Sequence, residues 1–378
     1  MAHSADKRFF GGIFMLQSVE LINFKCFQKQ TFRITSLTVL AGLNGTGKSS
    51  LLQSLLLLRQ SCGEFGLKQG LKLNGAYVNL GSAMDVLYEK SETDSLSIAI
   101  QENDQLDRYQ FSCTDSYSDN LSLEEYRGSI GKDSVIFSNH FSYLPAYRIA
   151  PSPVYSITNE DNLKRRDFGI NGEFSVHYLK QYGGKPIPCA EMIRGGTEND
   201  SLNLQVREWM NLILPGVIPI INLNLQTRTA ELGYEFIQGT EKSMTFKSTN
   251  VGFGITYVLP VLVTLLSAQK GDLVLIENPE AHIHPKGQRY LGELIARAAS
   301  GGVQVLLETH SDHVLNGIRI AVRQRMLEAE AVTLSYFTHD YGNFRSQVIY
   351  PQMLGSGQLD QWPEGFFDEW DNSLSELL

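Results

Sequence analysis

The chain has 378 residues, of which 42% are hydrophobic and 19% are charged. This composition excludes an intrinsically disordered protein, and the length suffices for one large α/β domain or two smaller ones. The net charge of −9 argues against a protein that coats nucleic acid, and the four widely spaced cysteines show neither zinc-ligand nor disulfide spacing.

The N-terminal segment, residues 1–15, contains no sustained apolar run and so does not resemble a secretory signal. Met15 could serve as the first residue in place of Met1. The longest apolar run, residues 255–268, is too short to span a bilayer. We therefore expect a cytoplasmic protein with no membrane segment.

The first part of the chain combines strand-like segments with a leucine-rich helix. Residues 16–27 alternate apolar and polar side chains and residues 37–41 are apolar, so both segments are predicted to be strands. After a glycine-rich turn, the leucines of residues 49–59 predict a buried helix. Residues 70–250 contain many polar and glycine breaks. The elements expected there are strands over 95–100, 109–113 and 227–237 and a helix over 202–214.

Helices and strands alternate again in the last third of the chain. The expected elements are a helix over 255–268, a strand over 273–276, a helix over 287–299, a strand over 303–307, a helix after Ser311, and strands over 332–338 and 344–350. The prediction is a single α/β domain, residues 1–378, with a mixed sheet. The first half of the α/β domain is expected at 1–70 and its second half at 250–350. An inserted antiparallel β-rich and helical lobe lies between them at 70–250, and an acidic aromatic tail follows at 351–378.

The strongest motif is GLNGTGKS at residues 42–49, which satisfies the phosphate-binding pattern GxxxxGK[S/T] between a strand and a helix. Its glycines let backbone N–H groups approach phosphate oxygens, and the helix that follows presents its positive end. Lys48 supplies a charge to the β and γ phosphates, and the Ser49 hydroxyl can ligate Mg²⁺. We expect ATP and Mg²⁺ to bind in contact with Asn44, Gly45, Thr46, Gly47, Lys48, Ser49 and Ser50.

Two later strands end in polar residues that suit the same site. The first leads into Glu277, which we assign as the metal-side carboxylate beside Ser49. The second leads into a Thr-His-Ser segment, where His310 could hydrogen-bond the γ-phosphate and report its loss. The alternative for this segment is a helix N-cap made by Ser311 or Asp312, with His310 incidental.

A glycine loop opens the helix predicted over 255–268. Its candidate binding residues are Asn250, Gly252, Gly254 and Thr256, in a geometry that suits an anion. The alternative is a plain turn and helix cap. The order of motifs favours binding, because a phosphate loop, a long insertion, a glycine loop, an acidic strand and a Thr-His-Ser strand follow one another.

That order resembles the ABC ATPases of the SMC, RecF and OLD-like group, in which the glycine loop is the signature motif that completes the site of the opposite subunit. The segment LINFKCF at residues 21–27 is similar to their N-terminal strand. The resemblance extends to a bacterial subgroup of small AAA-type ATPases with a C-terminal domain of unknown function, through residues 143–148, 168–173, 277–285, 308–313 and 362–370. It implies a P-loop NTPase fold of the ABC/SMC-head type and a homodimer that sandwiches ATP. Several such families are implicated in bacterial defence against phages, beside a separate effector.

Two positions depart from this group. ABC ATPases usually carry Asp-Glu after the acidic strand, with the Glu as base for the attacking water, whereas this chain has Glu277 and Asn278. Since an amide cannot accept a proton as a carboxylate does, Glu280 is the candidate base or water-positioning residue, with a structural carboxylate as the alternative. Thr256 and the bulkier Tyr257 stand where relatives tend to have Ser-Gln.

Three further residues have open roles at this point. His282 and His284 could form a metal pair, but the resemblance places them at a loop where ABC subunits touch across the dimer. Arg148 is a candidate phosphate- or interface-facing residue, with a surface salt bridge as the alternative.

The sequence thus predicts an ATPase, with Glu277, Glu280 and His310 as catalytic candidates, that works as a nucleotide-driven dimerisation switch. The preferred role is a slowly hydrolysing regulator of an anti-phage complex, gating a nuclease or other toxic partner. One alternative is a DNA-repair or DNA-binding ATPase of the RecF type, which the acidic balance disfavours. Another is a module that holds ATP with little hydrolysis, which Asn278 makes credible.

Overall fold

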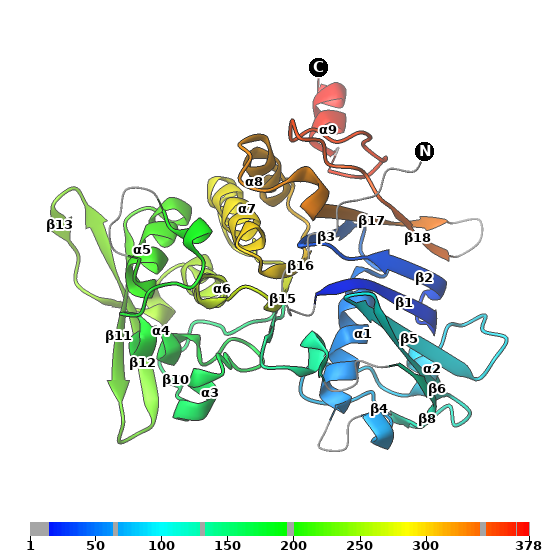
Figure 1. Cartoon of the computed structure of the whole chain (residues 1–378). Coiled ribbons are helices and arrows are strands. Elements are labelled where there is room, and N and C mark those ends of the chain that lie inside the picture. Colours follow the sequence, from blue (N-terminus) through cyan, green and yellow to red (C-terminus); the bar gives the residue numbers. More distant parts are fainter. Residues whose placement is uncertain are drawn as a thin grey trace.

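The phosphate loop belongs to a six-stranded sheet at the centre of the fold. The computed structural model describes residues 15–62, 67–128, 133–194, 200–340, 345–367 and 369–377, so Met1 lies outside the described part. In spatial order the strands are β18 (Arg345–Ile349), β17 (Val332–Asp340), β3 (Leu37–Gly42), β16 (Gln304–Glu308), β15 (Leu273–Glu277) and β9 (Phe141–Leu144). Neighbours are parallel except β17 and β18. The strand before the phosphate loop, β3, is therefore separated from the acidic strand β15 by β16 (Figure 1).

A second, antiparallel sheet lies beside the first. Its strands in order are β2 (Phe27–Arg33), β1 (Leu16–Phe24), β5 (Ser95–Glu102), β6 (Gln105–Ser112) and β8 (Leu123–Arg127). The single strand predicted over 16–27 is wrong, because β1 and β2 form a hairpin. Asn23 and Lys25 have φ values of 52° and 50° there, which turns the chain before β2 begins.

A third sheet lies at the far end of the molecule. It contains β12 (Thr229–Gln238), with β10 (Tyr155–Ser156), β11 (Val217–Asn224), β13 (Glu241–Lys242) and β14 (Phe246–Lys247) paired to it. The short strands β4 (Leu71–Lys72) and β7 (Asn120–Leu121) pair with each other. The segment 70–250, expected as one inserted lobe, thus contributes strands to the central sheet and to both antiparallel sheets as well as to the small pair.

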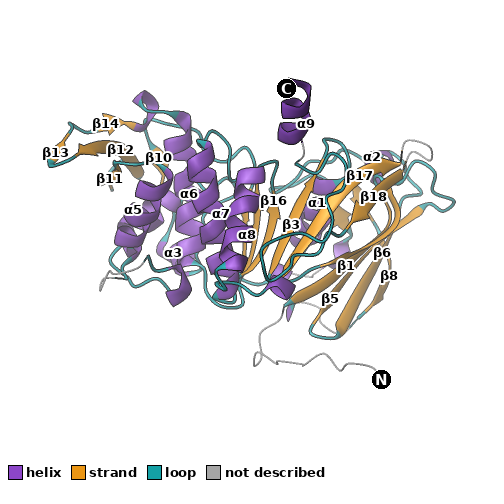
Figure 2. Cartoon of the chain, turned by 90° about the horizontal axis from the view of Figure 1, so that it is seen from above, coloured by secondary structure: helices purple, strands orange, loops and turns teal. Residues whose placement is uncertain are grey.

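Helices cover one face of the central sheet, and α1 with the first antiparallel sheet covers the other (Figure 2). The helices are α1 (Lys48–Ser61), α2 (Ala83–Val86), α3 (Glu160–Lys164), α4 (Ser175–Tyr182), α5 (Leu202–Ile213), α6 (Phe253–Ser267), α7 (Pro285–Ser300), α8 (Asp312–Arg323) and α9 (Glu369–Leu377). Short 3-10 turns lie at Leu67–Gln69, Val135–Phe137, Ala190–Met192, Ser248–Asn250 and Ala329–Ala331.

Side-chain alternation along the central strands builds the two cores. Val305 and Leu307 pack among the buried residues of α6, α7 and α8, whereas Leu306 between them packs with the leucines of α1. A parallel sheet buried on both faces explains why these strands are apolar throughout. The helices predicted over 49–59, 202–214, 255–268 and 287–299 are confirmed to within two residues at each end. In the described part of the chain, no helix is long and apolar enough to cross a membrane.

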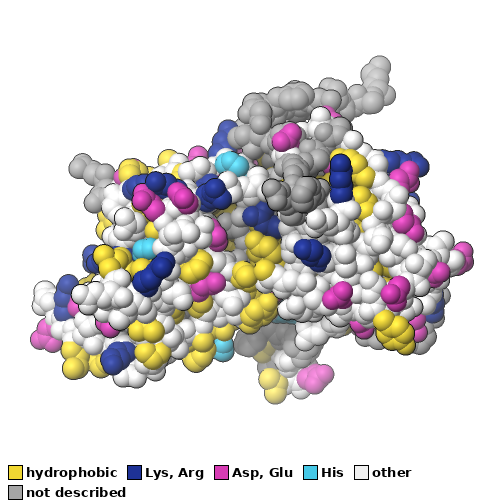
Figure 3. Space-filling model, turned by 90° about the horizontal axis from the view of Figure 1, so that it is seen from below, with side chains coloured by type: hydrophobic (Ala, Val, Ile, Leu, Met, Phe, Trp, Pro, Cys, Tyr) yellow, Lys and Arg dark blue, Asp and Glu magenta, His cyan; other side chains and the backbone are white. Residues whose placement is uncertain are grey.

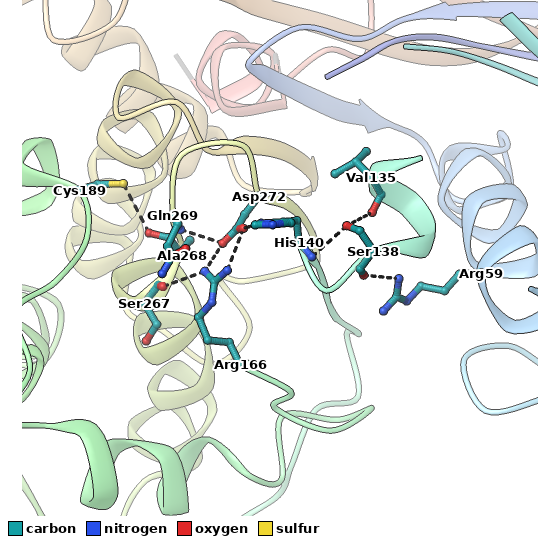
Figure 4. Close-up of polar contacts among 10 residues, drawn as sticks. All are labelled: Arg59, Val135, Ser138, His140, Arg166, Cys189, Ser267, Ala268, Gln269 and Asp272. Atoms are coloured by element: carbon teal, nitrogen blue, oxygen red, sulfur yellow. Dashed lines mark hydrogen bonds and ion pairs between the residues drawn. The ribbon is translucent and has the colours of Figure 1, made fainter. Parts of the chain in front are cut away.

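A polar network ties the halves of the fold together at the amino end of β15 (Figure 4). The side chain of Asp272 is 6% exposed and binds Arg166, with one nitrogen–oxygen distance of 3.0 Å, and the His140 ring at 2.7 Å. The segment before β9 is held in turn by α1, because Arg59 donates to the carbonyl of Ser138 at 2.9 Å. These contacts fix the helical half against α1 at the edge opposite the phosphate loop.

Candidate nucleotide site

The phosphate loop connects β3 to α1 at the carboxyl edge of the central sheet. Gly42 and Gly47 have φ values of 138° and 99°. A Cβ at Gly42 would lie 2.2 Å from the carbonyl oxygen of Phe337, and one at Gly47 would lie 2.5 Å from Cys26 Sγ. Both the backbone conformation and the space therefore require glycine.

The cation and the hydroxyl of the loop lie next to each other. Lys48 is 4% exposed, and its Nζ donates to the carbonyls of Gly42 and Leu43 at 2.9 and 2.6 Å. Burial lowers the pKa of Lys48, while the nearby Glu308 raises it. Ser49 Oγ donates to Glu308 Oε1 at 3.1 Å. Of the other expected contacts, Asn44 and Gly45 are exposed, Gly47 is half-buried, and Thr46 and Ser50 are buried.

Two carboxylates end neighbouring strands on the same face of the sheet, because Glu277 of β15 and Glu308 of β16 are paired in register. Glu277 accepts a hydrogen bond from the Tyr143 hydroxyl at 3.0 Å and one from the Ala146 N–H at 3.3 Å, and burial raises its pKa. Glu308 is 6% exposed, and burial, followed by the charge of Glu277, raises its pKa to about 7. Its Oε2 has no hydrogen-bond partner in the described part of the chain.

The loop after β15 carries Glu280 and approaches the next strand end. Glu280 Oε1 accepts the backbone N–H of His310 at 2.8 Å, and burial raises the pKa of Glu280. His310 is exposed on one side. The burial of the rest of its ring, together with the charge of Lys48, lowers its pKa, which favours the neutral imidazole. Asn278 has a φ of 43°, and its backbone N–H donates to the carbonyl of Glu308 at 2.8 Å. Ser311 is also the N-cap of α8, so the cap and the site share one segment.

Arg148 acts as a buried clamp on this loop. It is 1% exposed and donates to the carbonyls of Glu277 at 2.8 Å, Asn278 at 2.7 Å and Tyr257 at 3.1 Å. Burial lowers its pKa to about 10, so it stays protonated at neutral pH. Both roles expected for Arg148, a phosphate- or interface-facing group and a surface salt bridge, are wrong, because its donors bind backbone in the interior.

The glycine loop lies against the loop after β15. Asn250 and Gly252 are exposed, and a Cβ at Gly254 would lie 2.2 Å from the carbonyl oxygen of His282. Thr256, expected to contact a partner's nucleotide, is instead fully buried, with its hydroxyl 3.5 Å from that of Tyr234. The phosphate loop, Glu277, Glu280 and His310 thus gather at one sheet edge, while the glycine loop forms a separate surface beside it.

His282 and His284 have different surroundings. The ring of His282 packs against those of Phe253 and Tyr257, with centroids 5.4 and 5.3 Å away. His284 Nδ1 accepts the N–H of Lys286 at 3.2 Å and caps α7. No group of three metal-ligating side chains gathers among the described residues, so the imagined metal pair gains no third ligand there.

Two hollows flank the phosphate loop. One, of 380 Å³, is lined by residues of the loop together with Lys25, Cys26, Gln53 and Glu308. The other, of 320 Å³, lies between the loop, His310 and the C-terminal residues Gly365, Phe366 and Phe367. These residues fit ATP with Mg²⁺, since Mg²⁺ at phosphates usually takes only one or two protein ligands, and Ser49 stands beside a carboxylate with an unpartnered buried oxygen.

Comparisons with known proteins agree with this geometry. A family model of an AAA ATPase domain matches residues 15–173, and one described as an AAA domain, putative AbiEii toxin, Type IV TA system, matches 213–316. A third family model, described as a protein of unknown function (DUF3696), matches residues 327–377. Among solved structures, an Smc head domain with an extended coiled coil, bound to the C-terminal domain of ScpA and derived from Pyrococcus furiosus, is 11% identical. Its TM-score is 0.54, over 97% of this chain and 100% of that chain. Family models of AAA ATPase domains thus match two separate parts of the chain, and its fold is that of an SMC head.

A second solved structure has the same fold. The SmcHead bound to the C-winged helix domain of ScpA is 12% identical, with a TM-score of 0.53 over 89% of this chain and 98% of that chain. The predicted fold class, an α/β P-loop NTPase of the SMC-head type with a mixed sheet, is confirmed. No curated protein matches the chain.

Glu308, whose Oε1 lies 3.1 Å from the Ser49 hydroxyl, was not singled out from the sequence. It directly precedes the Thr-His-Ser segment, yet only Glu277 was assigned to the metal side. The missing information was the strand order, which places β16 next to β3. A signal existed, because an acid that ends an apolar strand is the feature that singled out Glu277.

Proposed function

We propose that this chain binds ATP with Mg²⁺ and hydrolyses it slowly, as a nucleotide-driven dimerisation switch. The observation that carries the proposal is the meeting of Lys48, Ser49 and Glu308 around one hollow at the sheet edge. An exposed glycine loop packs beside it. The first arrangement suits nucleotide binding, and the second offers a surface for the nucleotide of another subunit.

Each residue has a defined task in this proposal. Lys48 binds the β and γ phosphates, and Ser49 with a neighbouring carboxylate binds Mg²⁺, which when bound offsets negative charge on the phosphates. Glu280, held by the His310 N–H at 2.8 Å, orients the attacking water or takes its proton. The neutral His310 ring hydrogen-bonds the γ-phosphate. Loss of that phosphate therefore changes the segment whose backbone N–H donates to Glu280.

The switch acts through the glycine loop. Two chains close head to tail, with Asn250 and Gly252 of each near the nucleotide of the other, and Phe253, which is 49% exposed, becomes covered. Removal of the γ-phosphate loosens the pair and converts hydrolysis into a change of shape.

We further propose that the shape change regulates a separate effector in a bacterial anti-phage complex. The family description as a putative AbiEii toxin of a Type IV TA system supports a defence setting. Two similar Smc heads were solved bound to a partner protein, ScpA, which supports a protein partner. Basic and acidic side chains are interspersed over the described part of the face in Figure 3, so that face does not favour DNA as the partner.

A second candidate function is an ATP-holding module with little turnover. It is favoured by Asn278, which stands where related ATPases carry the catalytic glutamate, and whose buried Oδ1 has no hydrogen-bond partner in the described residues. In that case ATP closes the dimer and dissociation of ATP opens it.

Light scattering tests the proposal. The mass is measured with Mg²⁺ alone and with ATP and Mg²⁺, for wild type and Lys48→Ala, while phosphate release is followed in parallel. We expect ATP to double the mass of the wild type and not that of Lys48→Ala. Turnover that Glu280→Gln abolishes selects the hydrolysing switch, whereas closure without turnover selects the ATP-holding module. A mass that nucleotide does not change refutes the switch.

A further inference from the structure

Glu308 ends the strand next to β3, whereas Glu277 ends the strand beyond it. Glu308 of β16 is paired in register with Leu40 of β3 on one side and with Glu277 of β15 on the other. Since neighbouring strands lie about 4.8 Å apart, Glu308 is one strand from β3 and Glu277 is two. The strand order therefore favours Glu308 as the acid that reaches the residues after β3.

The hydrogen bonds of the two acids lead to the same conclusion as the strand order. Glu308 Oε1 accepts from Ser49 Oγ at 3.1 Å, and Glu308 is the acid among the residues that line the 380 Å³ hollow. Both oxygens of Glu277 instead accept hydrogen bonds from Tyr143 and Ala146, at 3.0 and 3.3 Å. Tyr143 belongs to β9, on the side of β15 away from β16, so Glu277 is held away from the phosphate loop.

The Ser49 hydroxyl has one proton and two lone pairs. By donating its proton to Glu308, it keeps both lone pairs for a cation. A carboxylate that accepts from a metal ligand fixes the orientation of that ligand and raises its basicity. Oε2 of Glu308 is buried and has no hydrogen-bond partner in the described part of the chain, so the bond from Ser49 is the one that holds this carboxylate toward the phosphate loop.

We propose that Glu308, rather than Glu277, is the positioning residue of the Mg²⁺ side of this site, acting through the hydroxyl of Ser49. This inference rests on the proposed binding of ATP. Glu277 then serves the fold, by joining the ends of β15 and β9. The assignment of Glu277 as the metal-side carboxylate is replaced by a Ser49–Glu308 pair on adjacent strands.

The test separates binding of nucleotide from binding of metal. Calorimetry measures the affinity for ATP in EDTA and in Mg²⁺, for wild type, Glu308→Gln, Glu277→Gln, Ser49→Ala and the double variant Ser49→Ala/Glu308→Gln. Electron paramagnetic resonance of Mn²⁺ added with ADP reports the metal directly, without turnover. Thermal unfolding in EDTA checks that each variant folds, which the neutral, isosteric glutamine should allow.

We expect Glu308→Gln to bind ATP in EDTA like the wild type and to lose about 10- to 100-fold in affinity for Mg²⁺ or Mn²⁺. Glu277→Gln, the matched control, should keep most of the increase in ATP affinity that Mg²⁺ gives the wild type. The double variant should be no weaker than Ser49→Ala, because both changes remove one interaction. A purely structural role for Glu308 would lower ATP affinity equally with and without Mg²⁺.

The inference is overturned if Glu308→Gln keeps the full increase in ATP affinity that Mg²⁺ gives the wild type, or if the losses of the two single variants add in the double variant. Either result leaves the proposed binding of ATP unaffected. Loss of the gain in Glu277→Gln alone does the same and restores Glu277 to the metal. A wild type that binds no ATP under either condition overturns the proposed function and this inference together.

Discussion

Replacing Arg148 by methionine tests whether the loop after β15 is held by one buried guanidinium. Arg148 donates to four carbonyls, those of Pro145, Tyr257, Glu277 and Asn278, over distances of 2.7–3.1 Å. Methionine retains an apolar stem of similar length and removes the charge and all of the donors. The carbonyls are then left in the interior without the partner that holds them.

The expected loss follows from the burial of the group. A buried acceptor left without its partner costs about 1–3 kcal/mol, and for the four carbonyls together we take a loss of ~4 kcal/mol. With an unfolding entropy of ~2.1 cal/mol/K per residue, the 378-residue chain has a slope of about 0.8 kcal/mol per degree. A loss of ~4 kcal/mol thus lowers the melting temperature by about 5 °C. Because Arg148 also fixes the carbonyls beside Glu280, hydrolysis should fall more than ATP affinity.

Scanning calorimetry and circular dichroism measure the melting temperature, and the exposed Arg165→Met is the matched control. Arg148→Lys should lie between wild type and Arg148→Met, since an ammonium keeps the charge but not the planar fork. If Arg148→Met melts within about 1 °C of the control, the clamp does not stabilise the loop and the reasoning is refuted.

Three further perturbations give distinct outcomes. Gly47→Ala should abolish ATP binding and lower stability, because its Cβ would meet Cys26 Sγ at 2.5 Å. In the control Gly45→Ala the new Cβ has no atom within 4 Å, so the substitution should cost only about 1–3 kcal/mol of backbone strain. Equal melting temperatures of the two variants would contradict this reasoning. Burial raises the pKa of Glu102, so its contribution to stability is fully present below the unfolded-state pKa and is lost as pH rises through the folded-state pKa. Urea midpoints between pH 4 and 8 should therefore fall more steeply for wild type than for Glu102→Gln, and parallel curves would refute it. Phe366→Ala, which removes a ring 1% exposed and 5.1 Å from that of Tyr336, should cost about 3–5 kcal/mol of local stability. Limited proteolysis should cut the C-terminal segment faster in Phe366→Ala than in the control Phe246→Ala, whose ring is 37% exposed. Equal cleavage rates would show that the Phe366 ring does not anchor that segment.

Local patterns predicted much of this molecule, and contacts between distant segments account for the rest. The helix after the phosphate loop and the apolar strand before Glu277 follow from runs of adjacent side chains, which sequence displays directly. The hairpin at Lys25 was missed because its positive φ leaves no signature in hydrophobic pattern. Arg148 was misjudged and Glu308 was not singled out for a different reason, since their contacts depend on which strands become neighbours and where a long side chain is buried.

Gly254 touches the carbonyl of His282 so closely that even the Cβ of alanine would collide with it, at 2.2 Å. The first turn of α6 and the loop that carries Glu280 therefore move as one body. In the proposed dimer the former faces the partner's nucleotide and the latter the chain's own. Occupancy of one site would reach the other through a contact inside a single chain, so the two ATP molecules should bind cooperatively.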